Sequence, residues 1–296
     1  MKRSKFLKSS ILGLASLSMM DLKAKNASLS EIDSDSKPLD PNLGFNHLPN
    51  PKNNSMKNSL LIKAQDRGHA NHGWLDTNHT FSFANYYNPD RMHFGVLRVL
   101  NDDHVAAGAG FGTHPHENME IITIPLEGDL EHKDSMGTQE VIKNGDVQVM
   151  SAGTGIYHSE YNANKDKPVK FFQIWVFPNK RNVEPRYDQI TLEAPKMENQ
   201  FMQILSPNSE DEGVWIHQNA WFDLGRFESG KSLKHSLRNA KSNGVFAMVV
   251  DGKFKIEGQE LNPRDGFGIW EIDNLQIEAI ETGRLLLMEV PMEMNS

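Results

Sequence analysis

Two short motifs of histidine and carboxylate residues could do metal chemistry in this chain. The first is Gly112-Thr-His114-Pro-His116, and the second is His158-Ser-Glu160. Side chains at positions i and i+2 of a β-strand point to the same face of the sheet, so each motif can present two ligands in one direction. Two such strands brought together would close a site of three imidazoles and one carboxylate. The sequence therefore predicts a metal site at His114, His116, His158 and Glu160.

The spacing of the histidines is a weak signal without its surroundings. With 12 histidines among 296 residues, about 0.5 His-x-His pairs are expected by chance. The flanks strengthen the signal, because residues 119–126 are apolar and end near Gly128, and residues 146–150 alternate polar and apolar. Gly153 and Gly155 follow and are expected to supply the backbone geometry of the turn into the second motif. Both motifs therefore lie at the ends of predicted strands.

The elements that must position these motifs are strands. From about residue 60 to residue 177, short strand-like runs are divided by Gly, Asn, Asp and Pro, without a sustained 3.6-residue period. Residues 169–177 are almost continuously apolar, as in a strand that is buried on both faces. A second β-rich unit runs from about residue 201 to residue 292. Residues 178–197 contain three prolines among charged residues, which predicts an extended connector rather than a strand or a helix.

The sequence therefore predicts an all-β protein with two domains that follow an N-terminal segment. The predicted parts are a signal peptide (1–27), a disordered linker (28–58), a metal-binding domain (59–178), a connector (179–197) and a second β domain without a metal site (198–296). The second domain has only His217 and His235, which form no His-x-His pair.

The N-terminal segment has the outline of an export signal. Residues 1–8 are basic, and the apolar stretch at residues 11–20 is too short to span a bilayer. Export to the periplasm is the resulting expectation. The alternative is a disordered tail on a cytoplasmic protein, and residues 24–58 are too polar to offset the entropy cost of ordering.

Composition limits what the chain can bind. Its formal net charge is −8, and no basic run occurs beyond the N-terminus, so direct nucleic-acid binding is not expected. The absence of cysteine excludes disulfides, thiolate zinc sites, iron–sulfur clusters and cysteine nucleophiles. Any metal must therefore be held by nitrogen and oxygen atoms.

The two motifs and their glycines resemble the pirin family, a two-domain group within the cupin superfamily. The segments similar to the two cupin motifs are Gly108-(x5)-His114-x-His116-(x3)-Glu120 and Gly145-(x5)-Ser151-x-Gly153-(x4)-His158. Ser151 and the four residues before His158 depart from the broad cupin pattern, but pirins share both departures. The resemblance covers about residues 67–291. It implies two jelly-roll (double-stranded β-helix) cupin domains packed in one chain, and a monomer is the simplest expectation.

The resemblance also implies the ligands and their metal. In pirins, iron is held by residues that correspond to His114, His116, His158 and Glu160. Glu120 is a competing carboxylate, because many cupins take a ligand from the first motif. We favour Glu160, which shares a strand face with His158, and expect Glu120 behind it. Fe(II) is the family default, but the same donors suit Mn, Co, Ni, Cu or Zn.

Some pirins are quercetinases, which cleave the central ring of flavonols with O2. The resemblance therefore implies a dioxygenase that acts on a flavonol or another small aromatic enol, with Glu160 as the catalytic base. The alternative function is an iron-binding, redox-sensing protein that acts through a protein partner without turnover.

The remaining histidines and aromatic residues have weaker assignments. Packing or hydrogen-bonding roles are expected for His69, His72 and His79. His132 is expected either to line the mouth of the site or to lie in a turn. Three aromatic residues of the run at residues 169–177 are assigned to the core rather than to the wall of a flavonol pocket; they are Phe171, Phe172 and Trp175.

Overall fold

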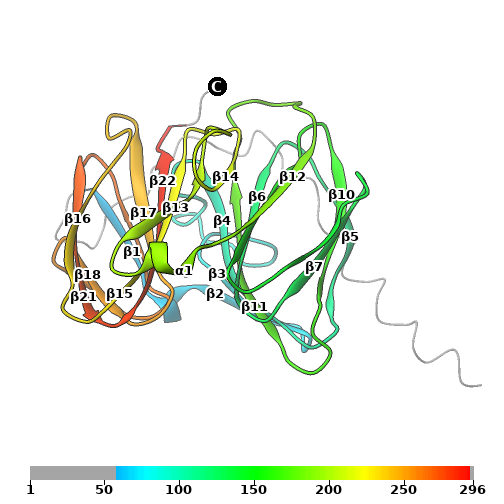
Figure 1. Cartoon of the computed structure of the whole chain (residues 1–296), viewed down its shortest axis with the longest axis horizontal. Coiled ribbons are helices and arrows are strands. Elements are labelled where there is room, and N and C mark those ends of the chain that lie inside the picture. Colours follow the sequence, from blue (N-terminus) through cyan, green and yellow to red (C-terminus); the bar gives the residue numbers. More distant parts are fainter. Residues whose placement is uncertain (1–57, 294–296) are drawn as a thin grey trace, which may run out of the picture. The chain divides into compact units, whose positions relative to one another are not determined.

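The computed structural model describes residues 58–293, and these residues form two β-sandwich domains (Figure 1). Each domain combines a seven-stranded sheet with a four-stranded sheet. The predicted signal peptide and residues 28–57 of the predicted linker lie outside the described residues. Within residues 58–293, no helix is long and apolar enough to cross a membrane.

The first domain contains the two histidine motifs. Its large sheet has the order β12 (Arg186–Thr191), β9 (Asp146–Ser151), β6 (Glu120–Glu127), β11 (Val169–Val176), β4 (Leu97–Val105), β3 (Leu75–His79), β2 (Gly68–Asn71). Its small sheet has the order β5 (Gly110–His116), β10 (Ile156–Asn162), β7 (Leu130–Asp134), β8 (Gln139–Ile142). The strand pairs of both sheets are antiparallel.

The second domain repeats this arrangement. Its large sheet has the order β1 (Ser59–Ile62), β20 (Gly266–Ile269), β17 (Asn243–Val249), β22 (Gly283–Pro291), β15 (Trp221–Phe227), β13 (Phe201–Ser206), β14 (Val214–Trp215). Its small sheet has the order β16 (Ser232–Ser236), β21 (Asn274–Glu281), β18 (Lys253–Ile256), β19 (Gln259–Leu261). The helical elements of the described chain are η1 (Ala64–Asp66) and α1 (Ala194–Met197). The predicted all-β fold with two sandwich domains in one chain is confirmed.

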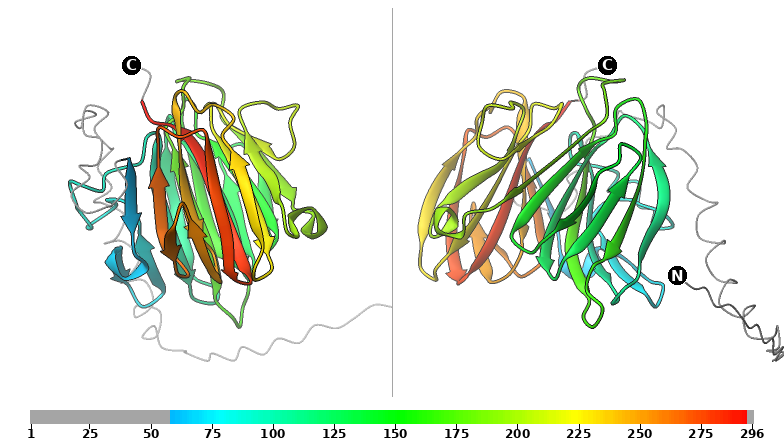
Figure 2. Two further views of the ribbon diagram at one scale, coloured as in Figure 1. Left: turned by 90° about the vertical axis from the view of Figure 1, so that its left-hand side faces the viewer. Right: turned by 45° about the vertical axis from the view of Figure 1, so that its right-hand side comes forward.

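The two large sheets pack face to face, as the views in Figure 2 show. Strand β11 contributes side chains to two hydrophobic cores. Its Phe172 and Ile174 belong to the core cluster between the domains, whereas Phe171 belongs to a separate cluster inside the first domain. Because side chains alternate along a strand, an apolar run buries both faces, as the sequence predicts for this segment.

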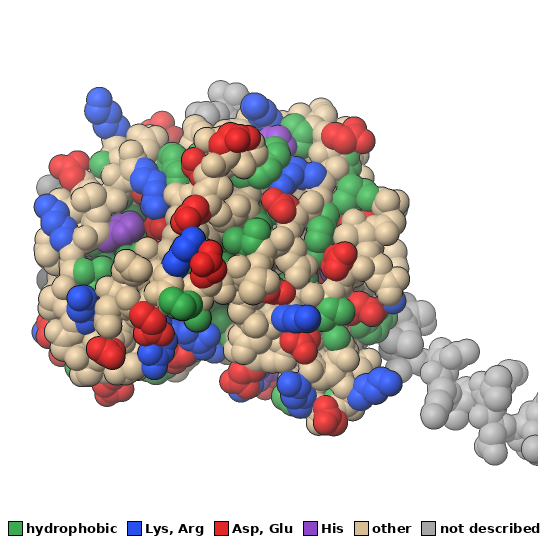
Figure 3. All heavy atoms as spheres, viewed as in Figure 1, with side chains coloured by type: hydrophobic (Ala, Val, Ile, Leu, Met, Phe, Trp, Pro, Cys, Tyr) green, Lys and Arg blue, Asp and Glu red, His purple; other side chains and the backbone are tan. Residues whose placement is uncertain are grey.

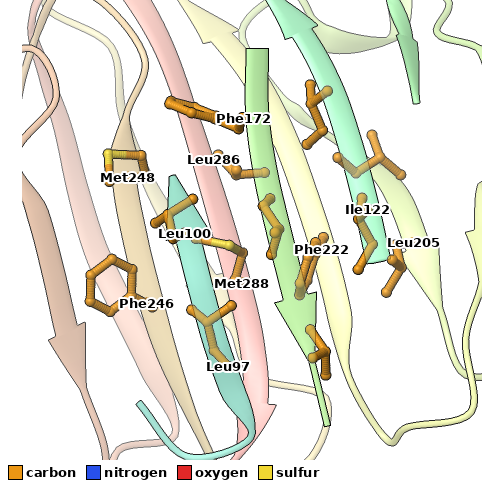
Figure 4. Packing of buried hydrophobic residues seen from close by; sticks show 14 of the residues in the cluster. Leu97, Leu100, Ile122, Phe172, Leu205, Phe222, Phe246, Met248, Leu286 and Met288 are labelled. Carbon is orange, nitrogen blue, oxygen red and sulfur yellow. The ribbon is translucent and has the colours of Figure 1, made fainter. Parts of the chain in front are cut away.

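The core between the domains is made of large side chains from both halves of the chain. Figure 4 shows Leu97, Leu100, Ile122 and Phe172 of the first domain packed with Phe246, Met248, Leu286 and Met288 of the second. Full burial of such a side chain contributes about 1.5–3 kcal/mol relative to exposure. The contact between the sheets is therefore a hydrophobic core and not a hinge.

Two segments differ from the predicted domain limits. The sequence assigns Ser59–Ile62 to the first domain, but β1 pairs with β20 and extends the large sheet of the second. The apolar pattern of this short segment does not specify which sheet edge it covers. The predicted connector also contains a strand, because β12 pairs with β9 over six residues, and the short helix α1 follows it. As an edge strand, β12 is polar and only half-buried, so it lacks the pattern that reveals buried strands.

On the face of the molecule drawn in Figure 3, acidic and basic side chains are interspersed. The described residues of that face do not form the continuous basic surface that binding to a nucleic-acid backbone would require.

Candidate metal centre

The predicted ligands meet on two neighbouring strands of the small sheet in the first domain. Strand β10 pairs with β5, and His158 lies directly opposite His114. Along β10, residues at alternate positions are buried, so His158 and Glu160 both point into the space between the two sheets of the first domain. The two sheets together form a barrel, and this space is its interior. The structure thus places the two sequence motifs on neighbouring strands; His114, His116 and His158 form one group of potential ligands, and Glu160 belongs to a second group with His158.

The three histidines form a compact group. The ring centroids of His114 and His158 are 4.4 Å apart, and both rings lie 4.9 Å from the ring of His116. One donor atom from each of the three residues lies within 4.8 Å of the others. Bonds of about 2.1 Å join donors up to about 4.2 Å apart, so small side-chain movements would close this group around one ion.

The protonation of these rings suits a metal site. Burial, reinforced by the charge of His114, lowers the pKa of His116 to about 3. Burial and the neighbouring histidines lower the pKa of His158 even further. His116 and His158 are therefore neutral imidazoles at neutral pH, which is the form that binds metals.

The unpaired nitrogens of His158 are the clearest sign that this site is suited to a ligand. The side chain is buried, and neither Nδ1 nor Nε2 has a hydrogen-bond partner among the described residues. A buried polar atom without a partner costs about 1–3 kcal/mol, so such atoms are rare. A metal bound by one of the nitrogens would remove part of this cost, so the residues present fit a metal.

Glu160 is held by two polar side chains from the opposite sheet. Gln173 Nε2 donates a hydrogen bond to Glu160 Oε2 at 2.8 Å, and Thr123 Oγ1 lies 3.3 Å from Oε1. Gln173 and Thr123 face each other across β11 and β6. The same hydroxyl oxygen of Thr123 lies 3.1 Å from Gln173 Oε1. Because a hydroxyl has one proton, Glu160 Oε1 and Gln173 Oε1 share this donor, and Glu160 Oε1 retains acceptor capacity.

His132 lies inside the barrel, and neither predicted alternative for it is correct. It lies opposite Glu160 in the register of β7 and β10, and it is fully buried. Its ring centroid is 5.4 Å from that of His158, and a second group of potential ligands consists of His132, His158 and Glu160.

Glu120 faces away from the histidines, so its expected position behind Glu160 is wrong. Ile122 and Ile124, which lie on the same face of β6, belong to the core between the domains. Glu120 accepts a hydrogen bond of 2.6 Å from Ser151 Oγ and another from the backbone of His217 in the second domain. Burial raises the pKa of Glu120 to about 7. No candidate group of ligands in residues 58–293 contains this carboxylate.

The aromatic residues of β11 divide between core and site. Phe171 and Phe172 are fully buried in core clusters, as expected. Trp175, however, lies edge-on against His116, with ring centroids 4.9 Å apart. Its Nε1 is buried without a partner in the described chain. Trp175 is therefore part of the wall behind a predicted ligand.

The histidines near the start of the first domain are outside the site. His79 Nδ1 lies 3.0 Å from Asn101 Oδ1, and its ring packs near Phe83. His69 Nε2 lies 2.8 Å from Asp76 Oδ1. These contacts agree with the packing and hydrogen-bonding roles expected for them.

The loop before His158 needs its glycines. Gly153 has a φ of 51°, and a Cβ atom there would collide with the carbonyl oxygen of Val183. That same oxygen accepts a hydrogen bond of 2.9 Å from the backbone N–H of Thr154. Gly155 has a φ of 131°. Only glycine adopts these conformations readily, so both residues serve backbone geometry, as predicted.

The second domain uses the equivalent strand differently. In the two small sheets, β16 takes the edge position that β5 takes in the first domain. His235 of β16 lies 3.8 Å from Asp223, but Arg238 makes two hydrogen bonds to that carboxylate, at 2.6 and 2.8 Å. Within residues 58–293, both candidate groups of metal ligands lie in the first domain.

This fold and this site define a two-domain cupin protein with a candidate metal centre in its first barrel. The chain belongs to the pirin family. The family model described as Pirin matches residues 62–176, and the model described as Quercetinase C-terminal cupin domain matches residues 203–290. The predicted resemblance is therefore confirmed.

Individual relatives match over most of their length. A quercetin 2,3-dioxygenase of Escherichia coli (strain K12) is 44% identical over 231 residues, which are 78% of this chain and 98% of the relative. A pirin-like protein of Caulobacter vibrioides is 36% identical over 223 residues, which are 75% of this chain and 95% of the relative. The crystal structure of the bacterial pirin YhhW from Escherichia coli in complex with nickel(II) is similar with a TM-score of 0.75 at 42% identity, and the match covers 79% of this chain and 99% of that one.

Proposed function

We propose that this protein is an O2-dependent dioxygenase of the quercetin 2,3-dioxygenase type, which acts on flavonols or related small aromatic enols. The observation that carries the proposal is the buried His158, whose two nitrogens lack hydrogen-bond partners among residues 58–293, next to two further histidines and the carboxylate of Glu160. The 44% identity to a protein named quercetin 2,3-dioxygenase supports the choice of reaction.

The proposed ligands of the metal are His114, His116, His158 and Glu160, and the proposed metal is Fe(II). The donors are neutral nitrogens and a carboxylate, which suit Fe(II) as well as other divalent transition metals. When bound, the metal would polarise the enol oxygen of the substrate and provide a redox centre for O2. The solved nickel complex of a 42% identical pirin supports a divalent metal in this fold.

The proposed ligands on β5 are more exposed than those on β10. His114 and His116 are half-buried, whereas His158 and Glu160 are buried. A flavonol would therefore approach from the side of β5. The reaction consumes one O2 for each flavonol, opens the central ring, and releases carbon monoxide with a depside.

Glu160 is the proposed general base. The enolic hydroxyl of the substrate must lose its proton before the ring can react with O2, and a carboxylate in a water-poor site can accept that proton. Oε2 is held by Gln173 Nε2 at 2.8 Å. Oε1 has only a shared contact with Thr123, so Oε1 is the oxygen available to take the proton.

The test is turnover of quercetin by the full chain loaded with Fe(II) and checked by metal analysis. Quercetin absorbance, O2 uptake and carbon monoxide release are followed together. We expect metal-dependent decay that His114→Ala and Glu160→Gln abolish. The exposed His104, in the same domain, provides the matched control His104→Ala, which should retain activity.

Other outcomes separate the parts of the proposal. If Glu160→Gln keeps its full metal content and full activity, Glu160 is neither ligand nor base. Bound metal without turnover of any aromatic enol would reject the dioxygenase. In that case, binding of a protein partner that depends on the oxidation state of iron would support the redox-sensing alternative.

A further inference from the structure

We propose that His132 is a further metal ligand and that it forms, with His158 and Glu160, an inner metal position. This position shares His158 and Glu160 with the outer position proposed above, which His114 and His116 complete. The donor atoms of His132, His158 and Glu160 lie within 4.8 Å of one another, as do those of His114, His116 and His158. The inference rests on the proposed metal centre for two of its ligands and adds a residue that the sequence motifs do not contain.

The strands place His132 where a ligand would be. His132 and Glu160 are direct neighbours across β7 and β10, so their side chains emerge on the same face of the small sheet. Both side chains are buried, and the ring of Tyr187 packs against the ring of His132 with centroids 4.7 Å apart. The imidazole is therefore held inside the barrel by packing.

Hydrogen bonding leaves Nδ1 of His132 free. Asp134 Oδ1 accepts hydrogen bonds from the backbone N–H groups of Met136 and Thr138, at 2.9 and 3.0 Å. Asp134 Oδ2 lies 3.1 Å from His132 Nε2. Because a carboxylate accepts, Nε2 carries the proton in the neutral imidazole, which is the form that binds metals, and Nδ1 then has the free lone pair.

That lone pair is unsatisfied, which points to a bound cation. Nδ1 of His132 is buried and has no hydrogen-bond partner within residues 58–293. A metal-bound histidine usually donates its other ring N–H to a carboxylate, which fixes the tautomer and raises the basicity of the ligand. The His132–Asp134 pair has this arrangement before any metal is added.

The two positions differ in their access to solvent. The outer position includes the half-buried His114 and His116, whereas all three ligands of the inner position are buried. Because both positions use His158, we expect one ion in each chain, at one position or the other. An ion at the inner position would be shielded from exchange.

The test removes the outer position and asks whether metal still binds. In the full-length double variant His114→Ala/His116→Ala, only His158 and Glu160 of the four predicted ligands remain. Binding of Co(II) is measured by equilibrium dialysis with metal analysis. We expect about one ion per chain at micromolar Co(II), with weaker affinity than in the wild type. Adding His132→Gln should abolish this binding.

A matched control and a second measurement keep the result unambiguous. His235 also has a buried nitrogen without a hydrogen-bond partner in the described chain but lies in the second domain, so adding His235→Gln to the double variant should leave metal binding intact. If the triple variant with His132→Gln does not fold, the double variant is produced with isotopically labelled histidine residues and then loaded with NMR-active cadmium. Coupling of the metal to two imidazole nitrogens is expected.

Several outcomes would overturn the inference. These are a double variant without bound Co(II), binding that His132→Gln leaves unchanged, or cadmium coupled to one imidazole only. A wild-type protein without bound metal would instead reject the whole proposed centre. The failure of the inner position is thus distinguishable from the failure of the proposed function.

Discussion

Trp175 and His116 are in edge-on contact, with ring centroids 4.9 Å apart and an interplanar angle of 81°. A transition-metal ion bound by His116 would lie within a few ångströms of the indole, where it quenches tryptophan fluorescence efficiently. We therefore expect Ni(II) or Cu(II) titration to quench the fluorescence of the wild-type protein.

The variant Trp175→Phe should remove most of that quenching while metal binding persists by dialysis. Trp270, buried in the core between the domains, provides the control. Trp270→Phe should lower the total fluorescence but preserve the fractional quenching at Trp175. Equal quenching in the Trp175→Phe protein would show that the ion binds elsewhere.

Gln173 is expected to control metal affinity without touching the metal. It donates the 2.8 Å hydrogen bond that orients the carboxylate of Glu160. Loss of such a supporting hydrogen bond typically weakens metal binding by about 10–100-fold. Competition with a chromogenic chelator should show a loss of this size in Gln173→Leu.

The control is Gln148→Leu, which removes another buried glutamine from the first domain. Gln148 Oε1 has no hydrogen-bond partner among the described residues, so its removal should change affinity much less. Equal losses in the two variants would mean that the effect is general damage to the barrel.

His158 is expected to reduce the stability of the metal-free protein. Its two buried nitrogens, which have no hydrogen-bond partner in the part of the chain that the structure describes, cost about 1–3 kcal/mol, and leucine fills a similar volume without polar atoms. In the presence of a chelator, His158→Leu should therefore unfold at the same or a higher urea concentration than the wild type. Metal at 100 times its Kd should stabilise the wild type by about 2.7 kcal/mol and leave the variant unchanged.

His79 is the matched comparison, because it is equally buried but bonded to Asn101 at 3.0 Å. His79→Leu should lose stability by about 1–3 kcal/mol, since it leaves a polar partner unpaired. Destabilisation of His158→Leu by a similar amount in chelator would contradict the assignment of the unpaired nitrogens.

The histidine pairs could be predicted from the sequence because the two-residue period of a strand sets their direction without any tertiary information. The position of Glu120 could not be predicted from the sequence. Strand β6 is buried on both faces over its first seven residues, so its pattern does not distinguish the barrel interior from the core between the domains. A shift of one residue along β6 would move the side chain of Glu120 from the core between the domains to the interior of the first domain. This difference decides whether the carboxylate can be a ligand.

Gln173 could have been found, because it is a polar residue in the apolar run of residues 169–177. A buried polar side chain needs a partner, and here the partner is Glu160. His132 gave no such signal, since it lies between Glu131 and Lys133 in a polar sequence. Its role depends on the pairing of β7 with β10, which local patterns do not encode.

Glu120 is expected to make the protein less stable as the pH rises. Burial raises its pKa in the folded protein from 4.5 to about 7. The unfolded chain therefore loses this proton first, so the contribution of Glu120 to stability is complete below pH 4.5 and falls as the pH rises to about 7. At about 1.4 kcal/mol for each pKa unit, the loss is about 3 kcal/mol.

Glu120→Gln should remove this part of the pH dependence. Urea unfolding should show little difference from the wild type near pH 4.5, and a variant that is more stable by up to about 3 kcal/mol near pH 8. Asp103, whose pKa burial also raises to about 7, will still titrate in both proteins, so the difference between them isolates Glu120. The exposed Glu127 on the same strand gives the control Glu127→Gln, which should keep the wild-type fall in stability. If Glu120→Gln is no more stable than the wild type at pH 8, Glu120 is already charged when it is buried in the interface. In that case, the charge of Arg186, which favours the ionised carboxylate, has a larger effect on the pKa of Glu120 than burial has.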